Sequence, residues 1–264
     1  MEIKERRNKK KLCIVTGIHG NEASLFEPLK RYVEQIELEN VLEIDLILAN
    51  QEAADKNVRY VDQDLNRSFG IQLNDNKETR IAKNLTTSCN ADLVLDLHTH
   101  TGNETFCLVS KKNLNRKIQQ FILCLNTKLC LVISSQVTGG KSLVENVQNS
   151  ISIETGQHSS PEAVEFAKEC IQKAILFLNQ EFIGNRIKTR FLKAEKFLYN
   201  QSNEEILLSS KINNFVQIDK GLEIYSGYCA EEAFIPALIS YSVKPGKKVL
   251  LICKEIVQGD VNHE

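Results

Sequence analysis

The chain has 264 residues, of which 42% are hydrophobic and 25% charged, values typical of one large globular domain or of a main domain with a small appendage. Its formal net charge of −1 gives no positive excess for binding nucleic acid or an anionic membrane, so we expect neither partner. No apolar run approaches the roughly 20 residues of a membrane-spanning helix, and we interpret the basic residues at 4–11 as a solvated tail because no signal-peptide core follows them.

The first two-thirds of the chain alternates apolar strands with amphipathic helices. In chain order we expect strand Leu12–Thr16, helix Glu22–Gln35, strand Leu42–Ala49, helix Lys77–Ser88, strands Asp92–Leu97 and Thr105–Val109, helix Leu114–Leu125, strands Leu129–Ile133 and Ser150–Ile153, and helix Pro161–Asn179. Short strands separated by helices predict an α/β fold with a largely parallel or mixed sheet.

Beyond residue 185 the pattern changes to short strands divided by polar turns. The expected strands are Arg190–Tyr199, Ile206–Leu208, Leu222–Tyr225, Ala237–Ser242 and Val249–Val257. We therefore predict two domains, a main domain at 1–185 and a small β-rich domain at 186–264.

The eight cysteines indicate a reducing environment. None of them forms a C-x-x-C pair, and most lie in apolar runs such as Leu12-Cys13-Ile14. Free cysteine behaves as a small buried hydrophobe, so we expect reduced core thiols and a cytoplasmic protein.

Two histidines and a glutamate stand where apolar strands end. His19 and Glu22 follow the first strand, and His98 ends the strand that contains Leu93-Val94-Leu95. Two imidazoles and one carboxylate are the ligand set of an open catalytic zinc site. His100 would share a face with His98 if that strand continued, so either histidine could be the third ligand on this pattern alone.

Two further segments carry candidate functional groups. The polar run Asp62-Gln63-Asp64-Leu65-Asn66-Arg67, with Arg59 before it, is either a solvated loop or a site that captures a substrate carboxylate through arginine. Asp64 could accept a hydrogen bond from a ligating histidine and so orient it. Glu154 ends another apolar strand, where a carboxylate is costly to bury unless it is paired or catalytic.

These segments together resemble the aspartoacylase and succinylglutamate desuccinylase family of the zinc carboxypeptidase superfamily. The matching motifs occur in the family's order over about residues 12–180, and they are Gly17-Ile18-His19-Gly20-Asn21-Glu22, Arg59-Tyr60-Val61-Asp62-Gln63-Asp64-Leu65-Asn66-Arg67, Asp96-Leu97-His98-Thr99 and Ile153-Glu154-Thr155-Gly156. The resemblance implies a carboxypeptidase-like mixed sheet flanked by helices, with a small C-terminal β-rich domain at the site entrance.

The resemblance also implies a mechanism and roles for individual residues. One zinc ion per subunit would be held by His19, Glu22 and His98 rather than His100, with Asp64 behind His19. Glu154 would be the general base and Arg59 the group that polarises the acyl carbonyl. Asn66 and Arg67 would grip the substrate carboxylate. The implied reaction is hydrolysis of an N-acylated amino acid, such as N-acetylaspartate or N-succinylglutamate.

The sequence departs from the family pattern at residues that determine substrate preference. Where aspartoacylases have an arginine and a tyrosine upstream of the general base, this chain has Gly139-Gly140-Lys141-Ser142, in which only Lys141 offers a cation. Phe234 stands where a substrate-binding tyrosine is expected, and a phenyl ring lacks the hydroxyl donor. Tyr225 or Tyr228 could replace it.

Several alternatives remain open on the sequence alone. A metallocarboxypeptidase acting on short peptides, or a degenerate member that binds a carboxylated ligand without turnover, would share the same ligand residues. The acyl group, the amino acid, the metal in the cell and the formation of a homo-oligomer are not fixed by these motifs.

Overall fold

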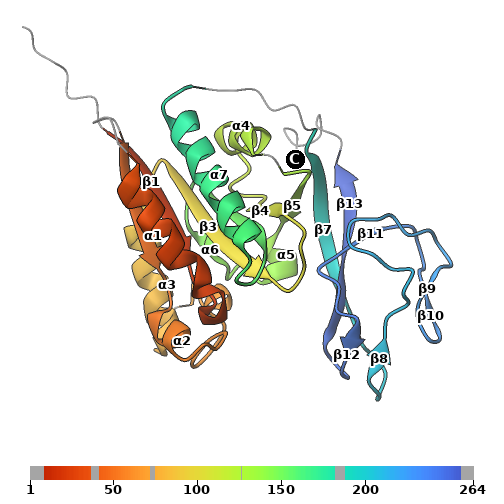
Figure 1. The fold of residues 1–264 in the computed structure, drawn as a ribbon. Coiled ribbons are helices and arrows are strands. Elements are labelled where there is room, and N and C mark those ends of the chain that lie inside the picture. The colour runs from red at the N-terminus through yellow and green to blue at the C-terminus, as the bar shows by residue number, and fades with distance from the viewer. Residues whose placement is uncertain (1–8, 37–41, 72–74, 126, 182–187, 257–264) are drawn as a thin grey trace, which may run out of the picture.

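The computed structural model describes residues 9–36, 42–71, 75–125, 127–181 and 188–256. A mixed nine-stranded sheet forms the centre of the molecule, in the order β11-β13-β7-β5-β4-β6-β3-β1-β2 (Figure 1). Its strands are β1 (Lys10–Thr16), β2 (Leu42–Leu48), β3 (Leu93–His100), β4 (Phe106–Ser110), β5 (Leu129–Ile133), β6 (Ser150–Gln157), β7 (Arg190–Tyr199), β11 (Ile235–Ala237) and β13 (Lys248–Ile256). The predicted α/β fold with a mixed sheet is confirmed.

Most neighbouring strands run parallel, as the alternation of strands and helices predicts. The antiparallel pairs are β4 with β6, β7 with β13, and β11 with β13. Because parallel strands place their carboxyl ends at the same edge, the segments that follow β1 and β3 meet there.

Helices cover both faces of the sheet (Figure 1). Those present among the described residues are α1 (Phe26–Gln35), α2 (Gln51–Asp55), α3 (Lys77–Ser88), α4 (Arg116–Cys124), α5 (Ser135–Thr138), α6 (Leu143–Asn146) and α7 (Pro161–Leu178), with 3-10 turns η1 (Gly20–Leu25) and η2 (Leu65–Arg67). None of them is long and apolar enough to cross a bilayer.

The alternation of side chains along β1 explains the two layers of the core. Leu12 and Ile14 pack on the face covered by α1, α4 and α7, whereas Cys13 and Val15 pack on the face of α3 and α6. Both cores are therefore built from the same buried strands.

The C-terminal region adds to the sheet as well as forming a small β-rich part of its own. β7 pairs in parallel with β5, and β13 and β11 continue the sheet outward. The shorter strands β8 (Ile206–Leu207) with β12 (Ser242–Val243), and β9 (Glu223–Tyr225) with β10 (Tyr228–Cys229), form two small ribbons. The predicted boundary between 1–185 and 186–264 lies at residues 182–187, outside the described residues, and it stays a prediction.

One predicted strand and one predicted helix differ from the structure. The predicted strand Ala237–Ser242 does not form, because the backbone turns out of the sheet at Leu238, whose φ is 52°. The predicted helix Glu22–Gln35 begins as the 3-10 turn η1, and its α-helical part starts at Phe26. The basic tail at 4–11 falls mostly outside the described residues.

All eight cysteines carry free thiols, in agreement with the expectation from the sequence. Seven of them are buried and Cys229 is exposed. Burial raises the pKa of the Cys124 thiol to about 11, so this group stays protonated at neutral pH.

Candidate functional site

The turn after β1 brings His19 and Glu22 to the same point. Gly17 takes a left-handed conformation (φ 64°), and Gly20 lies so close to the backbone of Ala53 and Ala54 that a Cβ atom there would overlap it. His19 occupies the N-cap of η1, and Glu22 falls in its first turn. Both side chains are consequently buried and directed to one side of the turn.

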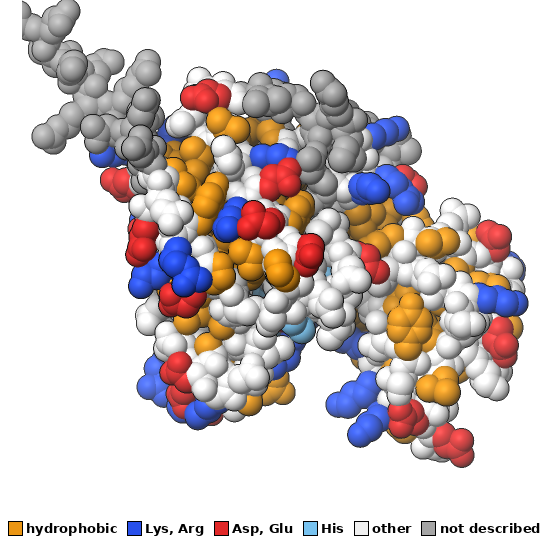
Figure 2. Space-filling view, in the orientation of Figure 1, with side chains coloured by type: hydrophobic (Ala, Val, Ile, Leu, Met, Phe, Trp, Pro, Cys, Tyr) orange, Lys and Arg blue, Asp and Glu red, His pale blue; other side chains and the backbone are white. Residues whose placement is uncertain are grey.

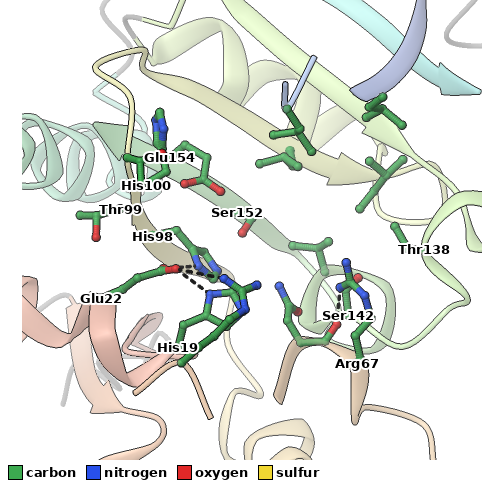
Figure 3. Close-up of a pocket in the computed structure, with 18 of the residues that line it drawn as sticks. His19, Glu22, Arg67, His98, Thr99, His100, Thr138, Ser142, Ser152 and Glu154 are labelled. Atoms are coloured by element: carbon green, nitrogen blue, oxygen red, sulfur yellow. Dashed lines mark hydrogen bonds and ion pairs between the residues drawn. The ribbon is translucent and has the colours of Figure 1, made fainter. Parts of the chain in front are cut away.

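His98, from the end of β3, completes a cluster of three potential metal ligands. Glu22 Oε1 lies 2.7 Å from Nδ1 of His19, and Oε2 lies 2.8 Å from Nδ1 of His98. One ligand atom from each of the three residues lies within 4.8 Å of the others (Figure 3). His100, the alternative on the strand pattern, is not in this cluster, since its ring contacts the backbone of Glu104 and Gly102.

A carboxylate stands behind each histidine. Nε2 of His19 lies 3.3 Å from Oδ1 of Asp64, and Nε2 of His98 lies 2.9 Å from Oδ2 of Asp96. An acceptor at Nε2 fixes the ring orientation and favours the tautomer with a lone pair on Nδ1. From the sequence we predict this role for Asp64 alone, although Asp96, two residues before His98 on the same strand, shares its face and could have been found by strand alternation.

Charge interactions shift the pKa values of Glu22, His98 and Asp64 in this part of the site. Burial opposes the charge on Glu22, but the two histidines outweigh it and hold the pKa of Glu22 well below its usual range. Burial also opposes a charge on His98, but Asp96 and Glu22 raise its pKa well above the usual value. The hydrogen bond from His19 and the charge of Arg59 hold the pKa of Asp64 low in spite of its burial.

The pairing of β3 with β6 supplies the next two groups. His98 lies opposite Glu154 in this register, and Asp96 lies opposite Ser152. Ser152 Oγ donates to the same oxygen of Asp96, at 2.8 Å. Residues two apart on one strand share a face, so all four side chains lie on the same side of the sheet.

Glu154 points into a cavity beside the cluster (Figure 3). Its Oε2 is buried and has no hydrogen-bond partner among the described residues. Burial raises the pKa of this carboxyl above its usual value. A buried carboxylate without a partner is costly, and such groups are typical of sites where chemistry takes place.

The segment after α2 places two arginines at the cavity. The Nε and Nη2 atoms of Arg59 lie 3.3 and 3.2 Å from Oδ2 of Asp64, and its Nη1 lies 3.8 Å from Glu22. Asn66 Oδ1 accepts from the backbone N–H of Leu143 at 3.0 Å, which leaves the amide nitrogen as its donor toward the cavity. Arg67 lines the same wall.

Glu78 of α3 holds this segment in place, a role that the sequence does not reveal. Its carboxylate is fully buried and accepts hydrogen bonds from the backbone N–H groups of Val61, Asp62 and Gln63, at 2.7, 3.2 and 3.3 Å. Asn50 donates a fourth, at 3.2 Å. The loop between the two arginines is thereby anchored to a helix of the main body.

The cavity has a volume of about 360 Å³, within the range of small-molecule sites. Histidine surface is visible in the notch between the main body and the C-terminal region (Figure 2). Among the residues assigned from the sequence, those that line the cavity are His19, Glu22, Arg59, Asn66, Arg67, His98 and Glu154.

Three sequence candidates, Lys141, Tyr225 and Tyr228, lie elsewhere, as does Phe234. Lys141 is exposed and does not line the cavity, because Ser142, the next residue of an extended segment, is the one directed inward. Phe234 and Tyr225 are buried in the core of the C-terminal region, and the partly buried Tyr228 packs against that core. Those two tyrosines stack on each other, with ring centroids 5.1 Å apart, and neither lines the cavity.

The residues of the cluster fit a divalent metal ion. Two imidazole nitrogens and one carboxylate oxygen converge, and each imidazole has a carboxylate acceptor on its far side. The partnerless oxygen of Glu154 stands close by and is not needed as a ligand. The arrangement can hold a metal with one coordination position left for water or substrate.

Comparison with known proteins gives a consistent match. The model of the succinylglutamate desuccinylase/aspartoacylase catalytic domain matches residues 8–174. A Prochlorococcus marinus subsp. pastoris protein named as a probable aspartoacylase is 35% identical over 102 residues, which are 36% of this chain and 35% of that protein. An N-acyl-aromatic-L-amino acid amidohydrolase (carboxylate-forming) from Xenopus laevis is 33% identical over 106 residues, 35% of each chain.

The fold agrees over nearly the whole chain. The crystal structure of succinylglutamate desuccinylase from Chromobacterium violaceum superposes with a TM-score of 0.74, at 17% identity, over 95% of this chain and 86% of that one. The segments matched in the two curated relatives span about a third of their length.

Proposed function

This chain belongs to the succinylglutamate desuccinylase/aspartoacylase family, and from that premise we propose that it is a zinc-dependent deacylase of N-acylated amino acids. It would hydrolyse the amide bond to give a carboxylic acid and a free amino acid. The roles predicted from the sequence for His19, Glu22, His98 and Glu154 form part of this proposal.

The position of Glu154 beside the three-residue cluster is the observation that carries the proposal. Glu154 lines the cavity, its Oε2 is buried without a partner among the described residues, and His98, opposite it on the neighbouring strand, is one of the proposed ligands. Amide hydrolysis needs a base that takes a proton from water and returns it to the leaving nitrogen. A carboxyl whose pKa is raised by burial suits both halves of that task.

The zinc ligands and Arg59 have separate roles in the proposed reaction. Zinc, when bound by His19, Glu22 and His98, would act as a Lewis acid toward water and the acyl carbonyl. Arg59 would direct its guanidinium at the oxygen of that carbonyl as negative charge develops.

Substrate positioning would come from η2. Asn66 and Arg67 both line the cavity, where the amide nitrogen of the first and the guanidinium of the second would donate to a substrate carboxylate. Fixing the carboxylate there would hold the scissile amide near Glu154.

The proposal also covers the ligand class and the metal. A cavity of about 360 Å³ favours a small acyl-amino acid over a peptide, which is the substrate of the metallocarboxypeptidase alternative. Zinc is favoured by the ligand set of two histidines and one carboxylate. The cytoplasmic location and the assembly into a homo-oligomer stay predictions.

Hydrolysis assays on metal-free and zinc-loaded protein test the proposal. The panel contains N-acetyl and N-succinyl derivatives of acidic and neutral amino acids, with short peptides of the same residues alongside. We expect turnover of an N-acyl amino acid that requires zinc and is absent from the chelated protein. Preferred cleavage of the peptides would establish the carboxypeptidase alternative, and a zinc-loaded protein inactive on the whole panel would refute catalysis.

A further inference from the structure

The cavity walls and charges narrow the class of amino acid that this site takes. Resting on the proposed function, we infer that the amino-acid half of the substrate carries one carboxylate, held by Arg67, and an apolar side chain. An acidic side chain, as in N-acetylaspartate, would find no second arginine or lysine without a carboxylate partner among the described residues that line the cavity.

The wall beyond the proposed metal cluster is apolar. It is formed by side chains from β4, β5, α5, α6, β7 and β13, most of which belong to one core layer of the sheet. These residues are Leu108, Ile133, Val137, Val144, Phe197 and Leu251. Leu238 adds a further apolar group at the rim, where it is 41% exposed.

The cavity has few arginine or lysine side chains among the described residues, and one of them is already paired with a carboxylate. Arg59 and Arg67 are the only lysine or arginine residues among the described residues that line it. Arg59 is paired with Asp64 at 3.2 Å and lies 3.8 Å from Glu22. Arg67 is therefore the cation left for substrate, and one guanidinium binds one carboxylate in the bidentate manner.

Arg67 stands on the same side of the cavity as the apolar wall. It lies next to Thr138 and Ser142 in Figure 3, across from His98 and Glu154. Val137 belongs to α5 together with Thr138, and Val144 belongs to α6, whose N-cap is Ser142. A substrate whose α-carboxylate meets Arg67 would thus place its side chain against the valines. A second carboxylate would lose its water there without gaining a partner.

Lys248 is a further cation, and it would favour an acidic substrate side chain if its ammonium reached the cavity. It does not line the cavity, but its Nζ lies 3.8 Å from the centre of the Phe197 ring, which does. Burial and the nearby charge of Arg67 lower the pKa of Lys248. In the structure this ammonium lies over the aromatic face of Phe197, and Lys248 is not among the residues that line the cavity.

Three substrates of matched size separate charge from shape. N-acetyl-leucine, N-acetyl-asparagine and N-acetylaspartate have side chains with the same number of non-hydrogen atoms, and kcat/KM for each is measured with the zinc-loaded protein. We expect leucine to exceed aspartate by roughly a hundredfold or more, with asparagine in between. A higher kcat/KM for aspartate than for leucine would overturn the inference and leave the deacylase function standing. No turnover of any acyl-amino acid would instead refute the proposed function.

Two variants locate the cause of the preference. Val137→Arg adds a cation to the wall, and the ratio of aspartate to leucine should rise by about tenfold or more, whereas Val137→Leu keeps the wall apolar and should retain the preference. The ratio is internal to each preparation, so a partly misfolded sample does not change it. If the wild type prefers aspartate and Lys248→Met abolishes that preference, Lys248 supplies the second cation and the inference is wrong.

Discussion

Replacing Asp96 tests whether the carboxylate behind His98 tunes metal binding. Asp96 is fully buried, and its Oδ2 accepts from Nε2 of His98 at 2.9 Å and from Ser152 at 2.8 Å. In Asp96→Asn the amide oxygen can take the place of Oδ2 and keep both bonds, while the charge is lost. Asp96→Ala removes the acceptor itself.

The geometry sets the size of the expected effect. A hydrogen bond to a charged group contributes about 1.5–3 kcal/mol and a neutral one about 0.5–1.5 kcal/mol. Losing the charge should therefore reduce the free energy of the hydrogen bond that orients His98 by about 1–1.5 kcal/mol. If zinc binding loses the same free energy, its Kd rises roughly tenfold. Asp96→Ala leaves a buried donor unpaired, and we expect roughly a hundredfold rise.

Competition with a chromogenic chelator at neutral pH measures both values. Asp92→Asn is the matched control, because Asp92 immediately precedes the same strand but faces Lys10 and Lys117. This control should bind zinc as the wild type does. A Kd for Asp96→Asn within about twofold of the wild type would refute the role of Asp96 in orienting His98.

The remaining predictions concern charge, binding and backbone. Burial raises the pKa of Glu154 above 4.5 in the metal-free protein, so the folded state retains this proton better than the unfolded state and loses stability as pH rises through that pKa. The Tm of Glu154→Gln minus the Tm of the wild type should accordingly be larger at pH 7 than at about pH 4. The same Tm difference at both pH values would contradict this prediction. In steady-state assays Arg67→Met should raise KM by roughly 10- to 100-fold, whereas Lys141→Met should leave KM unchanged. A similar rise of KM in both variants would contradict the placement of Arg67, and not Lys141, at the cavity. Gly20→Ala should cost about 3 kcal/mol or more in chemical denaturation, because its Cβ would overlap the backbone of Ala53, and a wild-type midpoint would disprove that contact.

Local sequence patterns predicted the elements that carry the site. Apolar runs in the sequence predict β1, β3 and β6. The polar residues at or just after the ends of these runs include His19, His98 and Glu154. This works because strand alternation and strand ends are set by neighbouring residues in the chain.

Features that depend on pairing between distant segments could not be predicted in the same way. Asp96 meets Ser152 only because β3 and β6 pair in one register, although strand alternation alone puts Asp96 on the same face as His98. Glu78 is likewise distant in sequence from the loop that it holds. The extension of the sheet by β7 and β13 likewise follows from nonlocal pairing. Lys141 is the one cation that the sequence offers shortly upstream of Glu154, whereas the direction of its side chain depends on the backbone of this extended segment.

The most direct test of the account is a paired measurement on Glu154→Gln. Zinc content per chain and turnover of the best acyl-amino acid are determined for this variant and the wild type, prepared in the same way. Because Glu154 is proposed to move protons and not to hold the metal, the variant should keep the wild-type zinc content and lose turnover by at least roughly a thousandfold. Turnover close to that of the wild type in a zinc-loaded variant would contradict the central claim.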